Sequence, residues 1–443
     1  MALRILEGSW STKIGHRRPG RSSRGRFRPV SAQFAALLLG AAASFNLLGN
    51  VAFHSIVARK GSVSSYGVTS LFLAFGVLAG VLGSGFQYAT ARRVAHQNAT
   101  QSSEFGRVAP WLALMVPITL LVALVRPIGE FVHVSNLPAV LLWGAYIFLT
   151  IAQAVPLGML TGTRYFRTLT VLVFFGVAVR LAFFPLLTSG HQTTESALLA
   201  SVLSTAAATV LAVVVVWRFR GGLRSDPPEG IITGTPAPSS EGMVGALLGA
   251  ALWGTWILGL VFARHYLSAN AAGIFSVGHT AAGGILFLTA AVANAYIPAV
   301  LRNPRSLRPV VNGLLLTVAI SVVSTLGLVV LGPTIFTHIY GPRYLLSRTL
   351  FLALGLSVSL VSCATFVLWA ARAQTMRHVI GQRTLYLIMP VGLVMEVALG
   401  VFWHSSALAI AMGPGVAVTV GVVVGLLVDA FQRSTNPTAG VEY

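Results

Sequence analysis

Charged residues are scarce in this chain. Only 9% of its 443 residues are charged and 55% are hydrophobic, whereas a typical soluble domain has about 25% charged residues. The mean hydropathy is +0.81. These values exclude an ordinary soluble protein and predict a polytopic membrane protein.

Lysine and cysteine are nearly absent. The two lysines, Lys13 and Lys60, do not follow a glycine, so the chain has no P-loop and is not an ATP-driven pump of that type by itself. A single cysteine, Cys363, excludes an intrachain disulfide. No histidine pair of the zinc-protease type occurs, and we expect neither a metal nor a cofactor.

Long apolar runs dominate what is present. A bilayer span needs roughly 20 mostly apolar residues. The sequence predicts about twelve such spans, at 34–58, 67–89, 108–126, 136–158, 169–188, 196–217, 244–263, 274–298, 309–331, 348–371, 384–403 and 406–429. The boundary between the last two is the weakest, because only His404 and Ser405 mark a turn.

The arginines predict how the chain is oriented. The net charge of +20 could suggest nucleic-acid binding, but the cations form short clusters between apolar runs, so no nucleic-acid partner is expected. Segments on the side of the N-terminal tail hold 23 Lys and Arg, and segments on the other side hold 6. The positive-inside rule therefore puts both termini in the cytoplasm of a cell (plasma or inner) membrane protein.

The predicted fold class is an all-α polytopic membrane protein, with two repeat-related six-helix lobes around a central cavity. The expected division is a basic, disordered tail (1–33), a first lobe (34–217), a cytoplasmic linker rich in Pro, Gly and Ser (218–243), a second lobe (244–429) and a cytoplasmic tail (430–443). The repeat is visible where Arg59 precedes Gly67 by eight residues and Arg264 precedes Gly273 by nine. Duplicated halves are typical of transporters.

Several motifs resemble a known family. They are Phe53-His-Ser-Ile-Val-Ala-Arg59, Tyr66-Gly67, Gly85-Phe-Gln-Tyr-Ala-Thr-Ala-Arg92, Leu160-Thr-Gly-Thr-Arg-Tyr-Phe166 and Ile339-Tyr-Gly-Pro-Arg-Tyr344. Together with the six-plus-six layout, they resemble the polysaccharide (O-antigen type) lipid-linked oligosaccharide flippases of the multidrug/oligosaccharidyl-lipid/polysaccharide exporter superfamily. The resemblance implies a transporter, not an enzyme, that moves a polyprenyl-pyrophosphate-linked glycan from the inner to the outer leaflet. It also implies contact with membrane lipids, and glycan polymerases and glycosyltransferases as candidate partners.

Arg180 and a polar stripe are the first candidate substrate-binding residues. Arg180 lies in the middle of a predicted span, where a charge costs at least about 2.5 kcal/mol on insertion scales and usually faces protein or water. Its planar guanidinium suits a phosphate, although pairing with a carbonyl or an acid is the alternative. Asn46, Asn50 and His54 are spaced by four residues and share one helix face, which lines either a wet cavity or a neighbouring helix.

Three further residues complete the predicted substrate site. Arg59 and Arg264 end repeat-related spans, where they contact the substrate headgroup or reach the lipid interface. Thr255 lies near the repeat position of Asn50 and is flanked by Trp253 and Trp256, which could stack on sugars but more often pack in the core.

Glu396 is the predicted ion-coupling residue. It is the one acid deep in a predicted span. A buried titratable acid can couple proton or sodium entry to transport, or it can pair with Arg180 or His279.

Three other functions compete with the flippase. A drug or small-cation exporter of the related multidrug and toxic compound extrusion family would favour acids, and Arg180 opposes a cation. A membrane glycosyltransferase or glycan polymerase would need catalytic residues on sizeable external loops, which the predicted topology lacks. A scaffold for a glycan-export machine is the third alternative.

Overall fold

The computed structural model describes residues 32–95, 109, 136–163, 165–188, 193–218, 239–302, 306–372, 382–403 and 406–435. Apart from short turns, the described ranges are α-helical. The predicted third span (108–126) lies outside them except for one residue. So do residues 1–31 of the predicted tail and residues 219–238 of the predicted linker.

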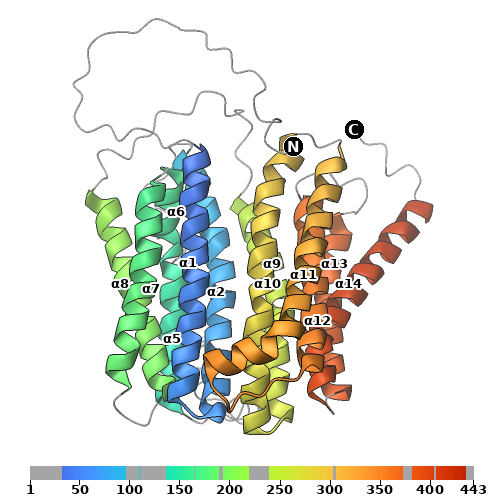
Figure 1. Cartoon of the computed structure of the whole chain (residues 1–443). Helices are drawn as coiled ribbons and strands as arrows, with labels where there is room; N and C mark the ends of the chain where they lie inside the picture. Colours follow the sequence, from blue (N-terminus) through green and yellow to red (C-terminus); the bar gives the residue numbers. More distant parts are fainter. Residues whose placement is uncertain are drawn as a thin grey trace, which may run out of the picture.

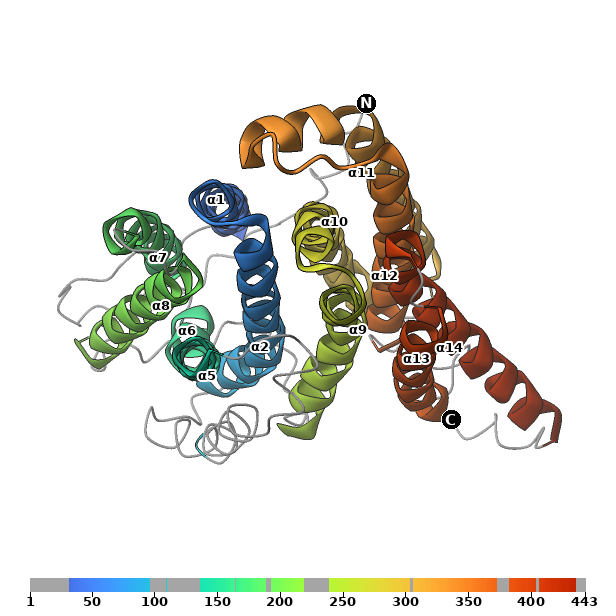
Figure 2. The same ribbon diagram turned by 90° about the horizontal axis from the view of Figure 1, so that it is seen from below.

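The helices form two groups. The first contains α1 (Ala32–Lys60), α2 (Val63–Ala95), α5 (Leu137–Ala152), α6 (Ala154–Gly162), α7 (Phe166–Leu187) and α8 (Thr193–Arg218). The second contains α9 (Ser239–Tyr266), α10 (Ala269–Arg302), α11 (Arg308–Tyr340), α12 (Arg348–Arg372), α13 (Gln382–Phe402) and α14 (Ala407–Thr435). Figures 1 and 2 show the groups as two side-by-side bundles, and we call them the first and the second lobe.

The predicted membrane character is confirmed. Among the described residues, nine helical stretches are long and apolar enough to span a bilayer. Helices suit such spans because they satisfy every backbone polar group internally. The weakest predicted boundary is also present: α13 ends at Phe402 and α14 begins at Ala407, where the Ser406 hydroxyl accepts a bond from the Ala409 amide at 3.2 Å.

Most helices extend a few residues beyond their predicted spans, and three differences bear on the architecture. The span 136–158 is divided into α5 and α6 at Gln153, because Pro156 has no N–H for the carbonyl four residues earlier. The helix α9 starts at Ser239, five residues before the predicted span. The helix α11 continues past its predicted end, through Pro333, to Tyr340.

The part of α11 beyond its predicted end brings the second lobe into contact with α1 of the first. Pro333 lies inside α11, and an internal proline bends a helix. Figures 1 and 2 show the last part of α11 running sideways toward α1, out of line with the rest of its own lobe. We call the membrane face where α1 ends the Arg59 face.

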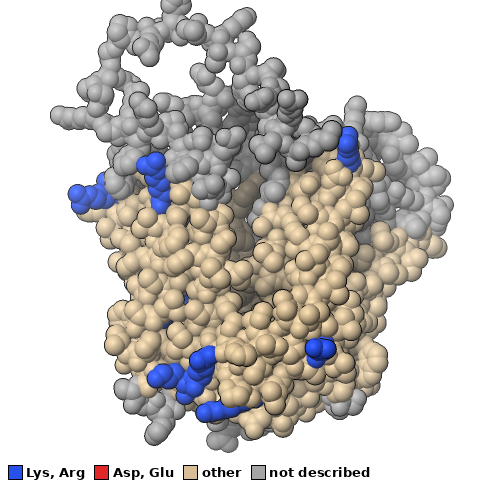
Figure 3. Space-filling model, in the orientation of Figure 1, with Lys and Arg blue, Asp and Glu red and all other residues tan. Residues whose placement is uncertain are grey.

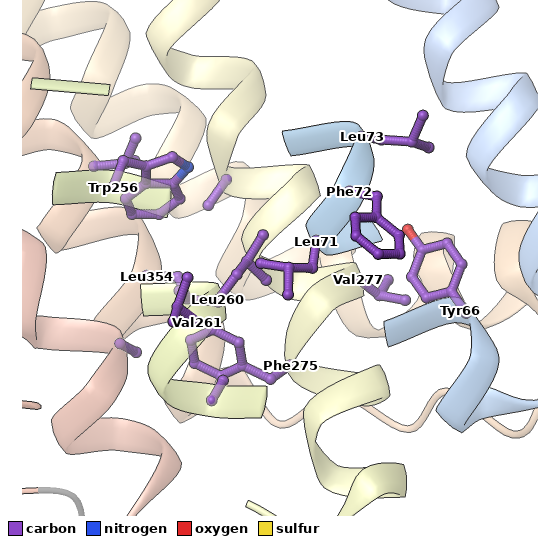
Figure 4. Close-up of a cluster of buried hydrophobic side chains, with 14 of the residues drawn as sticks. Tyr66, Leu71, Phe72, Leu73, Trp256, Leu260, Val261, Phe275, Val277 and Leu354 are labelled. Atoms are coloured by element: carbon purple, nitrogen blue, oxygen red, sulfur yellow. The ribbon is translucent and has the colours of Figure 1, made fainter. Parts of the chain in front are cut away.

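The lobes join mainly through α2, which packs against α9 and α10. One hydrophobic cluster crosses this junction, and Figure 4 shows part of it: Tyr66, Leu71, Phe72 and Leu73 of α2 with Trp256, Leu260, Val261, Phe275, Val277 and Leu354 of the second lobe. In the space-filling view of Figure 3 a hollow separates the lobes in the middle of the molecule and ends before the Arg59 face, where the surface is continuous. On the side seen in Figure 3 the lobes therefore touch at that face, where hydrogen bonds join α1 to the end of α11 and to the loop after it.

Burial distinguishes lipid-facing from central helices. Only 17% of the most apolar window of α11 is buried, against 61% for α10 and α12. Most of the exposed side chains of α11 are leucines and valines, such as Leu315, Val323 and Val330. An apolar exposed face of this kind suits lipid, so α11 lies at the periphery while α10 and α12 form the centre of the second lobe.

Candidate functional site

Arg180 projects from α7 into the interior of the first lobe. Its Nη2 donates a hydrogen bond to Oδ1 of Asn50 on α1. Its Cζ lies 4.7 Å from the centroid of the Phe53 ring, also on α1. Its charge is within electrostatic range of Tyr146 on α5. The contacts with α1 and the proximity of Tyr146 on α5 place the guanidinium on the inner side of α7.

The local sequence explains this inward position. Val177 and Phe184, three residues before and four after Arg180, are buried. Residues at this spacing share one face of a helix. Val177 packs at Gly49 of α1, where the absence of a side chain lets the helices approach. The same close approach brings Arg180 to Asn50 and Phe53.

The electrostatics of the Arg180 site are unusual because no acid among the described residues contacts the guanidinium. The hydrogen-bond partner among the described residues is an amide oxygen, and the ring contact is a cation–π interaction. The Nε of Arg180 is buried and has no acceptor among the described residues. A guanidinium has five N–H donors and no acceptor. The site therefore has a positive charge and one N–H donor that makes no hydrogen bond among the described residues.

The predicted polar stripe is divided between different surroundings. Asn50 contacts Arg180. His54 lies one turn further on, where its Nδ1 is 3.1 Å from the hydroxyl of Tyr66 on α2. Asn46 is exposed. Two of the three stripe residues thus lie in the interior of the first lobe together with Arg180.

Thr255 lies in the second lobe and is 3% exposed. Its hydroxyl donates to the Leu252 carbonyl of its own helix at 2.7 Å. The neighbouring Trp256 stacks on His279 of α10, with ring centroids 4.1 Å apart and an interplanar angle of 18°. The structure therefore places Thr255 and Trp256 in the core of the second lobe, where Trp256 has the packing role that the sequence favoured, whereas Arg180 belongs to the first lobe.

Glu396 is buried on α13, with 1% of its surface exposed. A β-carbon on Gly413 of α14 would lie 3.1 Å from both carboxylate oxygens, so the absence of a side chain there makes room for the acid. Its Oε2 has no hydrogen-bond partner among the described residues. Arg180 bonds to Asn50, and His279 bonds to the Trp256 carbonyl at 2.8 Å. Neither of the predicted structural partners of Glu396 is thus engaged with it.

Arg59 and Arg264 have unlike environments although they are repeat-related. Arg59 is exposed at the end of α1, and its Nε donates to the carbonyl of Ile339, in the last turn of α11, at 2.7 Å. Arg264, at the end of α9, is 7% exposed. The Arg59 contact crosses between the lobes, and a cavity of about 520 Å³ adjoins it, lined by residues 58–59 and by residues 337–344 excluding Ile339.

An aromatic cluster at the Arg59 face was not predicted. Tyr66 of α2 lies 5.8 Å from Tyr340 and 5.7 Å from Tyr344, both edge-on, and all three rings are buried. Burial raises the pKa of Tyr344, which lies in the loop after α11, so its hydroxyl keeps its proton. The motifs around these tyrosines signalled the family resemblance, but nothing in the sequence indicated that they meet.

The described residues contain no group of three or more His, Cys, Asp or Glu side chains that could hold a metal ion. The polar groups inside the first lobe are instead a guanidinium, an amide, an imidazole and hydroxyls. Each of these groups can donate a hydrogen bond and none is negatively charged, so they suit an anionic or hydroxyl-rich ligand more than a cation.

The fold is similar to those of solved membrane transporters. A lipid II flippase, MurJ, in an inward closed conformation has a TM-score of 0.64 at 11% identity, with 90% of this chain and 88% of that chain covered. An inward-facing multidrug resistance MATE family transporter of the MOP superfamily has a TM-score of 0.61 at 15% identity, covering 90% and 98%. A MOP superfamily transporter from Pyrococcus furiosus has a TM-score of 0.57 at 16% identity, covering 90% and 95%.

No protein-family model matches the sequence, and no curated protein matches it. At these identities the structural matches establish the fold alone. That fold is the two-lobe, all-helical fold of MOP-superfamily transporters, which confirms the predicted fold class.

Proposed function

We propose that this protein flips a polyprenyl-pyrophosphate-linked oligosaccharide from the inner to the outer leaflet by alternating access, for cell-surface polysaccharide biosynthesis. The observation that supports this most directly is the Arg180 site, where a guanidinium inside the membrane region contacts Asn50 and Phe53 but no acid among the described residues. An arginine fork with an unused buried donor suits a phosphate oxygen.

The physical difficulty in flipping such a lipid is its headgroup. Each phosphate charge is costly to take into hydrocarbon, whereas the polyprenyl tail is as apolar as the lipid around it. A fixed cation inside a lobe lowers the cost for the pyrophosphate while the tail stays in the bilayer. Asn50 and His54 add hydrogen-bonding capacity for the sugar hydroxyls, and we assign Asn46 to the entrance because it is exposed.

The contacts at the Arg59 face are those expected in one state of an alternating-access cycle, in which one side of the transporter is closed. The charge distribution assigns that face to the outside and both termini to the cytoplasm of the cell membrane. With this orientation, the contacts at the Arg59 face would shut the transporter toward the outside, and the hollow of Figure 3 would serve as the route of the headgroup. Arg59 and Arg264 would meet the headgroup as it leaves, and glycosyltransferases and a glycan polymerase would act before and after transport.

The test uses purified protein in liposomes with a fluorescent polyprenyl-pyrophosphate oligosaccharide, and the rate at which a membrane-impermeant quencher gains access to the probe. Arg180→Ala should lower the flipping rate at least about tenfold, because one lost charge-assisted contact of ~1.5–3 kcal/mol is worth that much. Arg180→Lys should retain part of the rate, because it keeps the charge but loses the fork. Arg218→Ala, which removes an exposed arginine at the end of α8, is the matched control. An unchanged rate in Arg180→Ala would remove Arg180 from the mechanism.

Glu396 supports a second candidate, an ion-coupled multidrug or small-molecule exporter. Its carboxylate is buried with one oxygen unpartnered among the described residues, and such an acid can take up a proton, a sodium ion or a cationic drug. In a flippase the same acid would couple an ion gradient to transport. Efflux of a cationic dye from the same liposomes, with no movement of the glycolipid, would favour the exporter.

Glu396→Gln tests the coupling role within either function. The variant should transport at a rate that no longer responds to a proton or sodium gradient, because the glutamine cannot exchange a proton or carry a charge. Glu195→Gln is the control, since Glu195 lies at the start of α8 and contacts Asn136 in the loop region. A gradient response equal to that of the wild type would make Glu396 structural.

A further inference from the structure

The C-terminal ends of α1 and α11 belong to different lobes and meet at the Arg59 face. Beyond Pro333 the helix α11 runs sideways until it reaches the last turn of α1 (Figures 1 and 2). Hydrogen bonds between the two ends join positions about 280 residues apart in the chain. The ring contact of Tyr340 with Tyr66 of the first lobe also involves the last turn of α11.

The last turn of α11 has backbone carbonyls that receive no hydrogen bond from within the helix. The last carbonyls of any helix lack an intrahelical donor. The carbonyl of His338 would normally be bonded by the amide four residues later, but that residue is Pro342, which has no N–H. Gly341, with φ of +106°, then turns the chain away from the helix axis. This helix end therefore needs donors from elsewhere.

The first lobe supplies those donors. Arg59 donates from Nε to the Ile339 carbonyl at 2.7 Å and from Nη2 to the His338 carbonyl. Ser55, one turn earlier on α1, donates to the Ile339 carbonyl at 2.5 Å. The positive guanidinium also lies at the negative end of the α11 macrodipole. Arg59 thus acts as the C-terminal cap of a helix in the opposite lobe.

The second lobe returns a contact of the same kind. The hydroxyl of Tyr344, in the loop after α11, donates to the carbonyl of Ala58 in the last turn of α1 at 3.3 Å. Tyr344 is held there by Tyr66 and Tyr340, with which it forms edge-on contacts at 5.7 and 6.1 Å. Each lobe therefore donates to the carbonyl end of a helix in the other.

We propose that this reciprocal capping, by Arg59, Ser55 and Tyr344, is the latch that holds the Arg59 face closed. The arrangement suits a reversible gate, because both sets of groups can bond to water when the lobes separate, so opening leaves no buried polar group unsatisfied. Closure also depends on geometry, since the donors reach the carbonyls of the opposite helix only when the two helix ends are correctly aligned. The inference concerns the movement of the lobes and holds whatever the cargo is.

A distance measurement tests the latch independently of transport. In a Cys363→Ser background, spin labels at Leu186→Cys on α7 and Asn270→Cys on α10 report the separation of the lobes at the Arg59 face, in lipid nanodiscs and without substrate. Both labelled positions are exposed and outside the latch. The wild type should give mainly the short distance. Arg59→Gln should shift the closed-to-open ratio by about tenfold toward the open form, as expected for loss of a charge-assisted bond.

Further variants separate capping from simple surface charge. Lys60→Gln removes the adjacent positive charge, from a side chain exposed at the same helix end, and should leave the distances unchanged. Arg59→Lys keeps the charge but cannot reach two carbonyls with a fork, so it should open the face partly. Ser55→Ala and Tyr344→Phe should each widen the distribution to a smaller extent. Equal distributions for Arg59→Gln and the wild type, or equal opening by Lys60→Gln, would overturn the latch.

Discussion

Gly67 of α2 and Gly273 of α10 lie against each other where the two lobes meet. A β-carbon on Gly67 would lie 3.2 Å from both the Cα and the amide nitrogen of Gly273. The two glycines occupy corresponding positions in the repeat, close after Arg59 and Arg264. The backbones of corresponding helices thus touch across the junction, near the face where Arg59 caps α11.

Enlarging Gly67 should separate the lobes at this face. In Gly67→Val the side chain would meet the backbone of α10, which cannot yield as a flexible side chain does. We expect the open population to rise at least several-fold, or the midpoint of thermal unfolding to fall, because forcing volume into a packed interface costs ~1–3 kcal/mol. Spin-label distances between Leu186→Cys and Asn270→Cys, together with thermal unfolding in detergent, measure both outcomes.

Gly80→Ala is the matched control for Gly67→Val. It lies on the same helix, but its nearest neighbour to an added β-carbon is a methyl group of Thr150 at 3.9 Å, an ordinary contact. It should leave the distances and the unfolding midpoint unchanged. If Gly67→Val behaves in the same way, the two glycines are not a close contact in the membrane.

Asn50→Asp should neutralise the Arg180 site. The carboxylate would replace the amide oxygen that now accepts from Arg180 and would form an ion pair in the interior of the lobe. We expect the thermal unfolding midpoint to be equal or higher and glycolipid flipping to fall by at least about tenfold, because the guanidinium is then occupied.

Asn50→Leu separates the two effects. It removes the acceptor and leaves the buried guanidinium less satisfied, which should lower the free energy of unfolding by about 1–3 kcal/mol. Both variants are measured by thermal unfolding and by the liposome assay. Full flipping activity in Asn50→Asp would show that the positive charge at this site is not used.

Pro333→Ala should straighten α11 by restoring the missing backbone N–H. The last part of the helix would then point away from α1, and the bonds from Arg59 and Ser55 to Ile339 would be lost. The distance between labels at the Arg59 face should lengthen as it does for Arg59→Gln. Pro185→Ala, in α7 of the first lobe, also removes an internal proline but lies outside the latch and should not change it.

Thr255→Val should have little effect on transport. The threonine hydroxyl is buried and already bonded to Leu252 of its own helix, and valine has nearly the same shape. The flipping rate should stay within about twofold of the wild type, because the hydroxyl bonds only to the backbone of its own helix and its loss removes no substrate contact. A loss of tenfold or more would restore the sequence-based prediction that Thr255 contacts substrate.

Much of the helical framework follows from the sequence alone. Apolar runs of about 20 residues predict spans, because a helix is the simple way to satisfy a backbone in hydrocarbon. The repeat after Arg59 and Arg264, and the linker region near 218–243, predict two lobes. Arg180 was predictable as a residue that faces protein or water, because a charge in the bilayer is too costly to face lipid.

Which side of each helix faces lipid and which faces the protein core was not predictable. In a soluble helix an apolar stripe marks the buried side, but in a membrane both the lipid-facing and the core-facing sides are apolar, so the pattern does not tell them apart. The sequence therefore left Asn46, Asn50 and His54 as one stripe. Packing exposes Asn46 and places the other two, both half-buried, against Arg180 and Tyr66.

Sequence by itself determined where helices run and which few polar groups must avoid lipid, because both depend on local transfer free energies. Only the tertiary structure decided which of those groups meet. Asn50 and Arg180 are 130 residues apart, and Arg59 and Ile339 are 280 apart. Such contacts depend on the bend at Pro333 and on the close approach of backbones at glycines, and these are properties of helix packing that no local pattern contains.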